Sequence, residues 1–261
     1  MVVSLKKHFA TETRSLEWCL KEYPKIEKDA TEVIEQIKSK VSFDLNSRIL
    51  DIGAAQGLFM IALKRLGYQC EGIEPSNQAH RVSKELEKKF NQKLNLTKGF
   101  AESLSFKQSS FDVVIGMSVI EHVKDVRKVL SEVYNVLKPG GGFYFLTASS
   151  LSPKQNEIRF FPFFSWYPDN IKRKIMKWAL KHKPSLIGYT HTPAVNWFTP
   201  WKAKKLLKAA GFKKIYDHWD LLPEQCLGQN KRNPLKLIGS NRALRLLADV
   251  IKSECSYLAV K

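Results

Sequence analysis

The chain has 261 residues, 44% of them hydrophobic, so it can bury the core of one or two domains. Its 43 lysine and arginine residues against 25 acidic residues give a formal net charge of +18. That balance favours an anionic partner such as nucleic acid, phospholipid or an acidic substrate, with a lysine-rich proteome as the alternative explanation. No apolar run reaches the ~18 residues that span a bilayer. Residues 1–8 lack the apolar stretch of a signal peptide, so neither a membrane span nor a signal peptide is expected.

The four cysteines are scattered along the chain without the spacing of a metal site. They are Cys19, Cys70, Cys226 and Cys255, and two of them, Cys70 and Cys255, fall in predicted strands. We expect them to be reduced, apolar side chains of a cytoplasmic protein.

Short apolar runs alternate with helical patterns after an N-terminal helical segment that is expected within residues 1–44. Residues 49–52, 113–115 and 143–146 are apolar without alternation, which is typical of strands buried on both faces of a parallel sheet. Strands that alternate with helices at this spacing indicate βαβ units.

The predicted helices are 77–90, 123–137, 169–182, 242–251 and one that begins at Pro200. Ser76 and Thr199 are typical N-cap residues, and Pro200 suits the first helical turn. Residues 253–260 are predicted to form the last strand, antiparallel to the others.

A turn of small residues follows the first predicted strand, in the segment Arg48-Ile-Leu-Asp-Ile-Gly-Ala-Ala-Gln-Gly57. Because the turn is built mainly from glycine and alanine, a ligand can approach its backbone closely. Glu74 ends the next predicted strand and can accept hydrogen bonds from the two hydroxyls of a ribose. These features predict a nucleoside-cofactor site at the C-terminal edge of the sheet.

An acid inside the strand end, in the pattern Asp51-x-Gly53-x-Ala55-x-Gly57, indicates which cofactor binds. A dinucleotide site is typically Gly-x-Gly-x-x-Gly, with a helix N-terminus aimed at the pyrophosphate. The Asp51 carboxylate would repel those phosphates and suits a cofactor with a cationic amine. The pattern resembles motif I of the class I S-adenosylmethionine-dependent methyltransferases, with Ala55 in place of the middle glycine.

Four further blocks resemble the same family and come in its order, at residues 99–106, 111–123, 136–146 and 198–212. The resemblance covers residues 45–150 and 195–220. It implies an α/β fold with a Rossmann-like, doubly wound, mostly parallel seven-stranded sheet, helices on both faces, and S-adenosyl-L-methionine as cofactor. The cofactor-binding residues that it implies are Asp51, Gly53, Ala55, Gln56, Gly57, Glu74, Pro75, Ala101, Glu102 and Met117.

The loop after the fourth predicted strand resembles that of methyltransferases of the ubiquinone O-methylation type, which carry Glu-x-x-Glu-His there. This chain has Ser118-x-x-Glu121-His122, so the first acid is missing and no obligatory metal ion is expected. In the alternative interpretation, Glu121 and His122 only cap and pack the following helix. His122 and His191 are the candidate bases that could deprotonate a hydroxyl acceptor. The alternative for either imidazole is a purely structural role.

Residues 151–196 form an insertion at the place where this family usually carries its substrate-binding elements. An aromatic run at 159–168 is broken by prolines, and the helix predicted at 169–182 is amphipathic. Its expected apolar face is Ile171, Ile175, Trp178, Ala179 and His182, and its expected cationic face is Lys172, Arg173, Lys174, Lys177 and Lys181. Residues 159–183 therefore predict a lid, a contact with an anionic membrane surface, or both, with nucleic acid as a further alternative.

The expected protein is a single-domain methyltransferase, spanning residues 1–261, that methylates an oxygen of a small or lipid-linked acceptor such as a glycan, quinone or isoprenoid. It is expected in the cytoplasm, with a peripheral membrane contact as an option. An RNA-directed methyltransferase is one alternative, although Gly116-Met-Ser-Val119 lacks the Asn/Asp-Pro-Pro-Tyr pattern of base methyltransferases. A catalytically inactive, cofactor-binding partner subunit is the other, and Ala55 is a hint of it.

Overall fold

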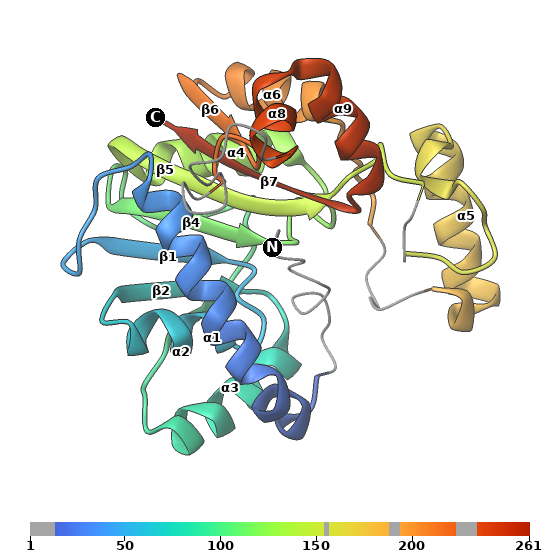
Figure 1. Ribbon diagram of the computed structural model, residues 1–261. Coiled ribbons are helices and arrows are strands. Elements are labelled where there is room, and N and C mark those ends of the chain that lie inside the picture. Colours follow the sequence, from blue (N-terminus) through green and yellow to red (C-terminus); the bar gives the residue numbers. More distant parts are fainter. Residues whose placement is uncertain (1–13, 154–156, 188–193, 223–233) are drawn as a thin grey trace.

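The computed structural model describes residues 14–153, 157–187, 194–222 and 234–261 (Figure 1). Seven strands form one sheet in the order β3-β2-β1-β4-β5-β7-β6. The strands are β1 Arg48–Ile52, β2 Gln69–Glu74, β3 Asn95–Lys98, β4 Phe111–Met117, β5 Leu137–Ala148, β6 Lys214–Asp217 and β7 Glu254–Val260. Within this sheet β7 runs antiparallel to β5 and β6, and the other neighbouring strands pair in parallel. The predicted Rossmann-like α/β sheet is confirmed.

Helices cover both faces of the sheet (Figure 1). The main-body helices are α1 Leu16–Lys38, α2 Leu58–Arg65, α3 Asn77–Phe90, α4 Val126–Val136, α6 Pro200–Ala209, α8 Pro234–Ser240 and α9 Arg242–Ile251. The helices α1, α2 and α3 share one hydrophobic core with the sheet, and α4 and α6 share another. Val113 and Ile115 of β4 enter the first core and Val114 enters the second, which explains why the central strands are continuously apolar.

Most predicted element bounds are confirmed, because local capping residues determine them. The Ser76 hydroxyl accepts from Ala79 N–H at the start of α3, and Thr199 accepts from Lys202 N–H at the start of α6. The helix predicted at 123–137 was too long. Asp125 accepts from Lys128 N–H and caps α4, and the residue after the helix already belongs to β5. The last strand begins at Glu254, one residue later than predicted.

Three of the four cysteines lie among the described residues. Cys19, Cys70 and Cys255 are buried and free, and the last two lie in β2 and β7 as predicted. Cys226 lies outside the described residues. No described helix is long and apolar enough to cross a membrane.

The insertion is a separate lobe beside the sheet, and α5 Asp169–His182 is its main helix (Figure 1). It leaves and rejoins the main body at one place, since Ser149 pairs with Phe198 and the Ser150 N–H donates to the Phe198 carbonyl at 2.9 Å. It has a small core of its own, formed by Ile158, Phe164, Met176, Ala179, Ile187, Ala194 and Trp197.

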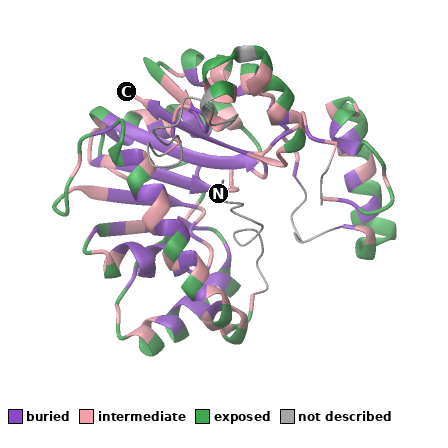
Figure 2. Ribbon diagram, in the orientation of Figure 1, coloured by how far each residue is buried: buried purple, intermediate pink, exposed green. Residues whose placement is uncertain are grey.

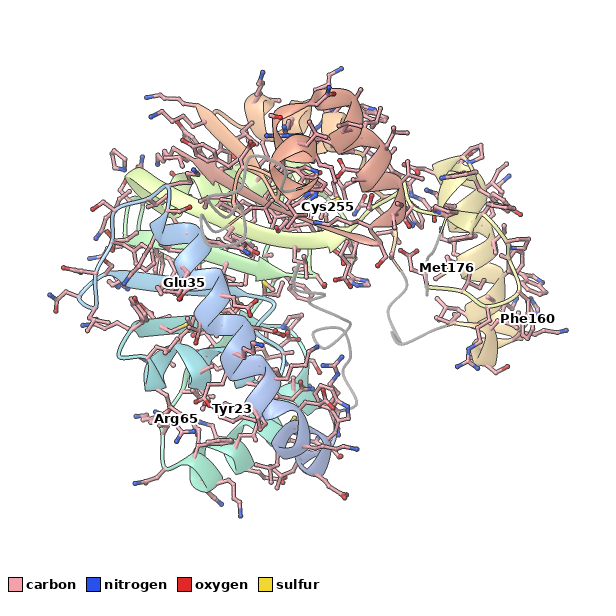
Figure 3. The ribbon with its side chains drawn as sticks, in the orientation of Figure 1. Tyr23, Glu35, Arg65, Phe160, Met176 and Cys255 are labelled. Atoms are coloured by element: carbon pink, nitrogen blue, oxygen red, sulfur yellow. The ribbon has the colours of Figure 1, made fainter. Side chains whose placement is uncertain are left out.

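The predicted faces of α5 were partly wrong. Lys172 is buried together with Met176 and Ala179, whereas Ile171 and Trp178 are exposed. Figure 3 shows Met176 on the inner side of this helix. The reason is that the Lys172 ammonium finds partners inside: Asp169 Oδ1 at 3.0 Å, the Ser165 carbonyl at 3.1 Å and the face of an aromatic ring. A buried cation with such partners is tolerated, which a hydropathy pattern cannot reveal.

Candidate active site

The small-residue turn between β1 and α2 is held against the end of β2. The backbone N–H groups of Gly53 and Ala54 donate to the Ile73 carbonyl at 2.8 and 3.1 Å. Gly53, Ala55 and Gly57 have φ angles of +66°, +48° and +80°, in the left-handed region that favours glycine. Alanine costs on the order of 1–2 kcal/mol in this conformation, so the surrounding contacts must hold the turn in its shape.

Neighbouring side chains also leave little room for a Cβ atom at two positions of this turn. A Cβ atom at Gly53 would lie 2.4 Å from Val119 Cγ2, and one at Gly57 would lie 2.6 Å from Leu94 Cδ1. A side chain at position 57 would therefore meet the core residue Leu94, so internal packing is a second reason for glycine besides ligand access. The Gly53–Val119 contact joins the turn to the loop after β4.

Two acids meet beside this turn, at the ends of β1 and β2. Asp51 is buried, and the Glu74 carboxylate accepts from Ala55 N–H at 3.0 Å and from Ser76 N–H at 2.9 Å. Burial, and then the charge of Glu74, raises the pKa of Asp51 well above its ordinary value. The pair forms a locally acidic edge that suits a ligand with a cationic group.

The other predicted cofactor residues lie at the same edge of the sheet. Gln56 is buried in the turn and Pro75 is exposed directly after β2, while Met117 ends β4 and is buried. Ala101 and Glu102 follow β3, and the Glu102 carboxylate accepts from the backbone N–H of Lys124 at 2.9 Å. The fold thus brings all ten predicted cofactor residues to the C-terminal ends of β1, β2, β3 and β4.

A second polar cluster lies farther along this edge, where β4 and β5 end. The Glu121 side chain is 5% exposed, and its carboxylate accepts from Thr147 Oγ1 at 3.0 Å. Burial raises the pKa of Glu121 to about 7, against the opposing effect of this hydrogen bond. Glu121 does not cap α4, because Asp125 does, so the capping part of that alternative is wrong for Glu121.

Of the two candidate bases, the structure describes one. His122 adjoins Glu121 and is partly buried, and its backbone N–H donates to the Val119 carbonyl at 2.9 Å. His191 lies outside the described residues. In the described ranges, no group of three or more His, Cys, Asp and Glu side chains could hold a metal ion.

Sequence reasoning missed one partly buried acid of the insertion, Glu157. It is partly buried in the insertion, and its Oε2 accepts from Trp197 Nε1 at 2.8 Å. Burial raises the pKa of Glu157, against the opposing effect of the Trp197 hydrogen bond. A lone acid in an irregular segment carries no pattern, so only the fold could show that it pairs with Trp197.

Known proteins resemble this chain in sequence. The family model of a methyltransferase domain matches residues 26–216. A ubiquinone biosynthesis O-methyltransferase of Paraburkholderia phymatum is 35% identical over 101 residues, which are 38% of this chain and 44% of that protein. The uncharacterized methyltransferase YcgJ of Bacillus subtilis is 34% identical over 97 residues, 37% of this chain and 38% of that protein. The chain thus matches less than half the length of these two relatives.

The fold is shared with solved methyltransferase structures. The phosphoethanolamine N-methyltransferase 2 of Haemonchus contortus, in complex with S-adenosyl-L-methionine, has a TM-score of 0.56 and 18% identity. The match covers 95% of this chain and 57% of that one, and at such identity it establishes the fold alone. Because the family model spans most of the sequence, the resemblance seen in the motifs is confirmed, and the chain belongs to the class I S-adenosylmethionine-dependent methyltransferases.

Proposed function

We propose that this chain transfers a methyl group from S-adenosyl-L-methionine to an oxygen atom of a small or lipid-linked acceptor. Its family and the acidic edge beside the turn support the cofactor and the reaction. We choose an oxygen atom as the methyl acceptor because the buried Glu121 carboxyl has a pKa of about 7. A base with a pKa near neutrality is well suited to take a proton from a hydroxyl at physiological pH.

The residues at the cofactor edge fit S-adenosylmethionine chemically. The Glu74 oxygens accept backbone hydrogen bonds from Ala55 and Ser76, and a carboxylate has several lone pairs with which it can also accept from a ribose hydroxyl. The buried Asp51 carboxyl suits the amine of the methionine part. The bound cofactor supplies a methyl group already activated on a sulfonium. The contribution of the protein is therefore mainly to orient the cofactor and acceptor and to receive one proton.

A phenolic hydroxyl suits this base better than an aliphatic one. The pKa of a tyrosine phenol is about 10, and each pKa unit between acceptor and base corresponds to about 1.4 kcal/mol. Aliphatic hydroxyls are weaker acids than phenols, so transfer of their proton to Glu121 would cost more free energy. The relatives named for O-methylation in ubiquinone biosynthesis support the same choice. We therefore favour a quinol-type acceptor over a glycan.

Methyl transfer from labelled cofactor tests this function directly. The purified protein is offered phenolic quinone precursors, glycans and RNA, and we expect label in the phenolic fraction as a methyl ether. Label in RNA would instead favour the RNA-directed alternative. Binding of S-adenosylhomocysteine without turnover of any acceptor would favour an inactive partner subunit.

A lipid-linked acceptor calls for contact with a membrane surface, and we propose that residues 159–183 provide it. The exposed apolar side chains there are Phe160 (87% exposed), Phe163, Trp166, Ile171, Trp178 and Leu180. The exposed cationic side chains are Arg159, Lys174, Lys177, Lys181 and Lys183. Figure 2 shows how much of α5 is exposed, and Figure 3 shows Phe160 at the outer edge of the insertion. Exposed aromatic and cationic groups together are typical of surfaces that bind anionic lipid.

Vesicle sedimentation tests the membrane contact with a charge-matched control. Changing Lys174, Lys177 and Lys181 to Glu should remove most binding to anionic vesicles, because each cation near such a surface contributes ~1 kcal/mol. The control changes Lys88, Lys89 and Lys93, which are also exposed, to Glu. Binding should fall with salt without vanishing, since salt does not screen aromatic insertion. Equal binding to neutral and anionic vesicles, or binding to neither, would contradict the proposal. Residues 159–183 would then be interpreted as a lid only.

A further inference from the structure

The helix before β7, α9, turns its polar side toward the protein. Arg245 Nη1 donates to Asp220 Oδ1 at 2.8 Å. The indole N–H of Trp219 donates to Asp249 Oδ1 at 2.8 Å, and the same oxygen lies 3.2 Å from His218 Nε2. Arg245 and Asp249 are four residues apart, so they occupy one side of the helix. Polar contacts thus hold α9 to the segment that follows β6.

The apolar side chains of α9 lie on its opposite side, toward solvent. Leu246, Leu247 and Ile251 are exposed, as is Leu237 of the neighbouring helix α8, with exposed fractions between 45% and 73%. We call these four side chains the α8–α9 apolar face, and Figure 2 shows exposed residues on both helices. Among the described residues, neither main hydrophobic core includes a side chain of α8 or α9. An amphipathic helix usually buries its apolar side, so this reversed orientation indicates a partner outside the chain's own core.

The charge of this segment favours lipid over a second copy of the chain as that partner. Residues 234–252 contain four lysine and arginine residues and one acid, Asp249, which is buried. Two copies that paired through this face would bring the same cationic segments together, because a two-fold interface joins identical surface patches. An anionic lipid surface instead attracts the cations and receives the apolar side chains, as it does for other interfacial helices.

The α8–α9 apolar face also adjoins the start of the insertion. The Ser149 N–H, just before the insertion, donates to the carbonyl of Ser253, two residues after α9 ends, at 2.9 Å. Glu254, the first residue of β7, pairs with Ala148 at the end of β5. The end of α9 therefore lies at the edge of the sheet where the parallel strands end, on the side from which the insertion projects (Figure 1).

We propose that the α8–α9 apolar face inserts into an anionic membrane surface and forms a second contact beside residues 159–183. The choice of lipid rests on the lipid-linked acceptor of the proposed function, and the inference assigns a role to helices that the proposed function does not use. Two contacts fix the orientation of the protein on the surface, whereas one leaves it free to tilt. The edge that carries Glu74 and Glu121 is then held close to the lipid from which the acceptor enters.

Sedimentation with anionic vesicles tests this contact in the 261-residue chain. In the double variant Leu246→Gln/Leu247→Gln we expect binding to weaken by about tenfold or more, because two apolar side chains no longer leave water. This loss should persist at high salt, unlike that of the lysine-to-glutamate variant of α5, since salt does not screen the hydrophobic contribution. Leu45→Gln is the matched control, because Leu45 is also an exposed leucine but precedes β1, at the opposite edge of the sheet.

Hydrogen exchange measured by mass spectrometry locates the contact in the unmodified protein, without turnover or substitution. The backbone amides of α9 should exchange more slowly when anionic vesicles are present. Equal exchange with and without vesicles, or wild-type binding by the double variant, would overturn the inference and leave the contact of residues 159–183 in place. Weaker binding in the double variant but not in the α5 variant would support the inference and contradict the contact of residues 159–183.

Self-association is the alternative that the same double variant can reveal. A wild-type dimer and a monomeric Leu246→Gln/Leu247→Gln variant, measured by light scattering, would assign the face to a second copy and overturn the lipid contact. Wild-type protein that binds no anionic vesicles would overturn it as well. Neither result affects the proposed reaction, which the methyl-transfer assay with phenolic acceptors tests without vesicles.

Discussion

The cofactor edge and the acceptor side of this protein are built from different kinds of sequence. One strand–helix–strand unit supplies the turn, Asp51 and Glu74, and two backbone hydrogen bonds from the turn to the Ile73 carbonyl complete its shape. The acceptor side that we propose draws Glu121 from the loop after β4, Thr147 from β5, and Asn196 from the end of the insertion, which bonds to this loop. The first region is local in the chain and the second is assembled over long distances.

This difference explains which part of the function each region determines. A local unit keeps its shape in many sequences, so the cofactor can be inferred from a motif. An assembled site can change its acceptor through the insertion while the cofactor edge stays as it is. The two regions touch where Gly53 packs against Val119, in the same loop as Glu121.

The largest expected effect comes from a substitution that impairs the acceptor side and leaves the cofactor edge unchanged. In Glu121→Gln the base is lost while the size of the side chain is kept. General base catalysis contributes about 10²–10⁴-fold, so kcat should fall by that factor. The affinity for S-adenosylhomocysteine, measured by calorimetry, should stay within about twofold of the wild-type value because a preserved cofactor edge leaves less than about 0.5 kcal/mol of difference.

Thr147→Val refines this test by changing the base without removing it. The Thr147 hydroxyl donates to Glu121 and favours its ionised form, so its loss should raise the Glu121 pKa above about 7. The acid limb of the pH–rate profile should therefore move to higher pH. A profile that stays in place would mean that Glu121 is not the titrating base.

The second effect breaks the cofactor edge alone. Glu74→Ala should lower the affinity for S-adenosylhomocysteine by roughly tenfold to over a hundredfold, because a charge-assisted hydrogen bond is worth ~1.5–3 kcal/mol. Glu71→Ala is the control, since Glu71 lies earlier in β2 and pairs with Arg48. Equal losses in the two variants would show that β2 has been disturbed generally and that Glu74 has no special role.

The sequence was sufficient for the features that depend on neighbouring residues. Caps such as Ser76 and Thr199 determined helix starts, and continuous apolar runs determined the central strands. The cofactor residues could be predicted because the motif and the following strand lie close together in the chain. Asp125, which ends its loop and caps α4, was missed because the apolar pattern extends past it to Val123.

The features that sequence could not reveal depend on partners far away in the chain. Lys172 lies on the buried face of α5 because the ring of Trp197, from the far end of the insertion, receives its charge together with Asp169 of the same helix. Glu157 accepts a hydrogen bond from Trp197, which follows 40 residues later in the chain. No hydropathy or motif pattern records such pairings, since the partner residues are separated by elements whose packing has to be known first.

A third, smaller effect tests the contact between the two regions. Gly53→Ala should destabilise the protein by ~1–3 kcal/mol more than Gly140→Ala, because its Cβ would overlap the stiff, branched Val119 side chain. Gly140 is the matched control, since its φ of +79° is similarly positive and nothing lies within 4 Å of a Cβ there. Urea unfolding gives the difference. Adding Val119→Ala should recover most of it, and a double variant as unstable as Gly53→Ala would rule out this contact as the cause.

The smallest expected effect is the pH dependence of cofactor binding, which isolates the charge at the cofactor edge. Burial, and then Glu74, raises the pKa of Asp51 well above 3.8 in the ligand-free protein. A cationic ligand beside Asp51 favours the carboxylate and lowers this pKa, so binding releases a proton between the lowered and the raised value. The affinity for S-adenosylmethionine should therefore increase with pH across that interval, by at most about tenfold per unit, and level off above it.

Calorimetry in buffers of different ionisation enthalpy counts the released proton directly. In Asp51→Asn the proton release should vanish and the affinity should become independent of pH over the same range, although it should be weaker throughout. Thr147→Val, which acts on the acceptor side, should leave the proton release unchanged because Thr147 contacts Glu121 and not the acidic pair. If Asp51→Asn still releases a proton on binding, the titrating group at this edge is not Asp51, and the charge complementarity assigned to it belongs to a neighbouring acid.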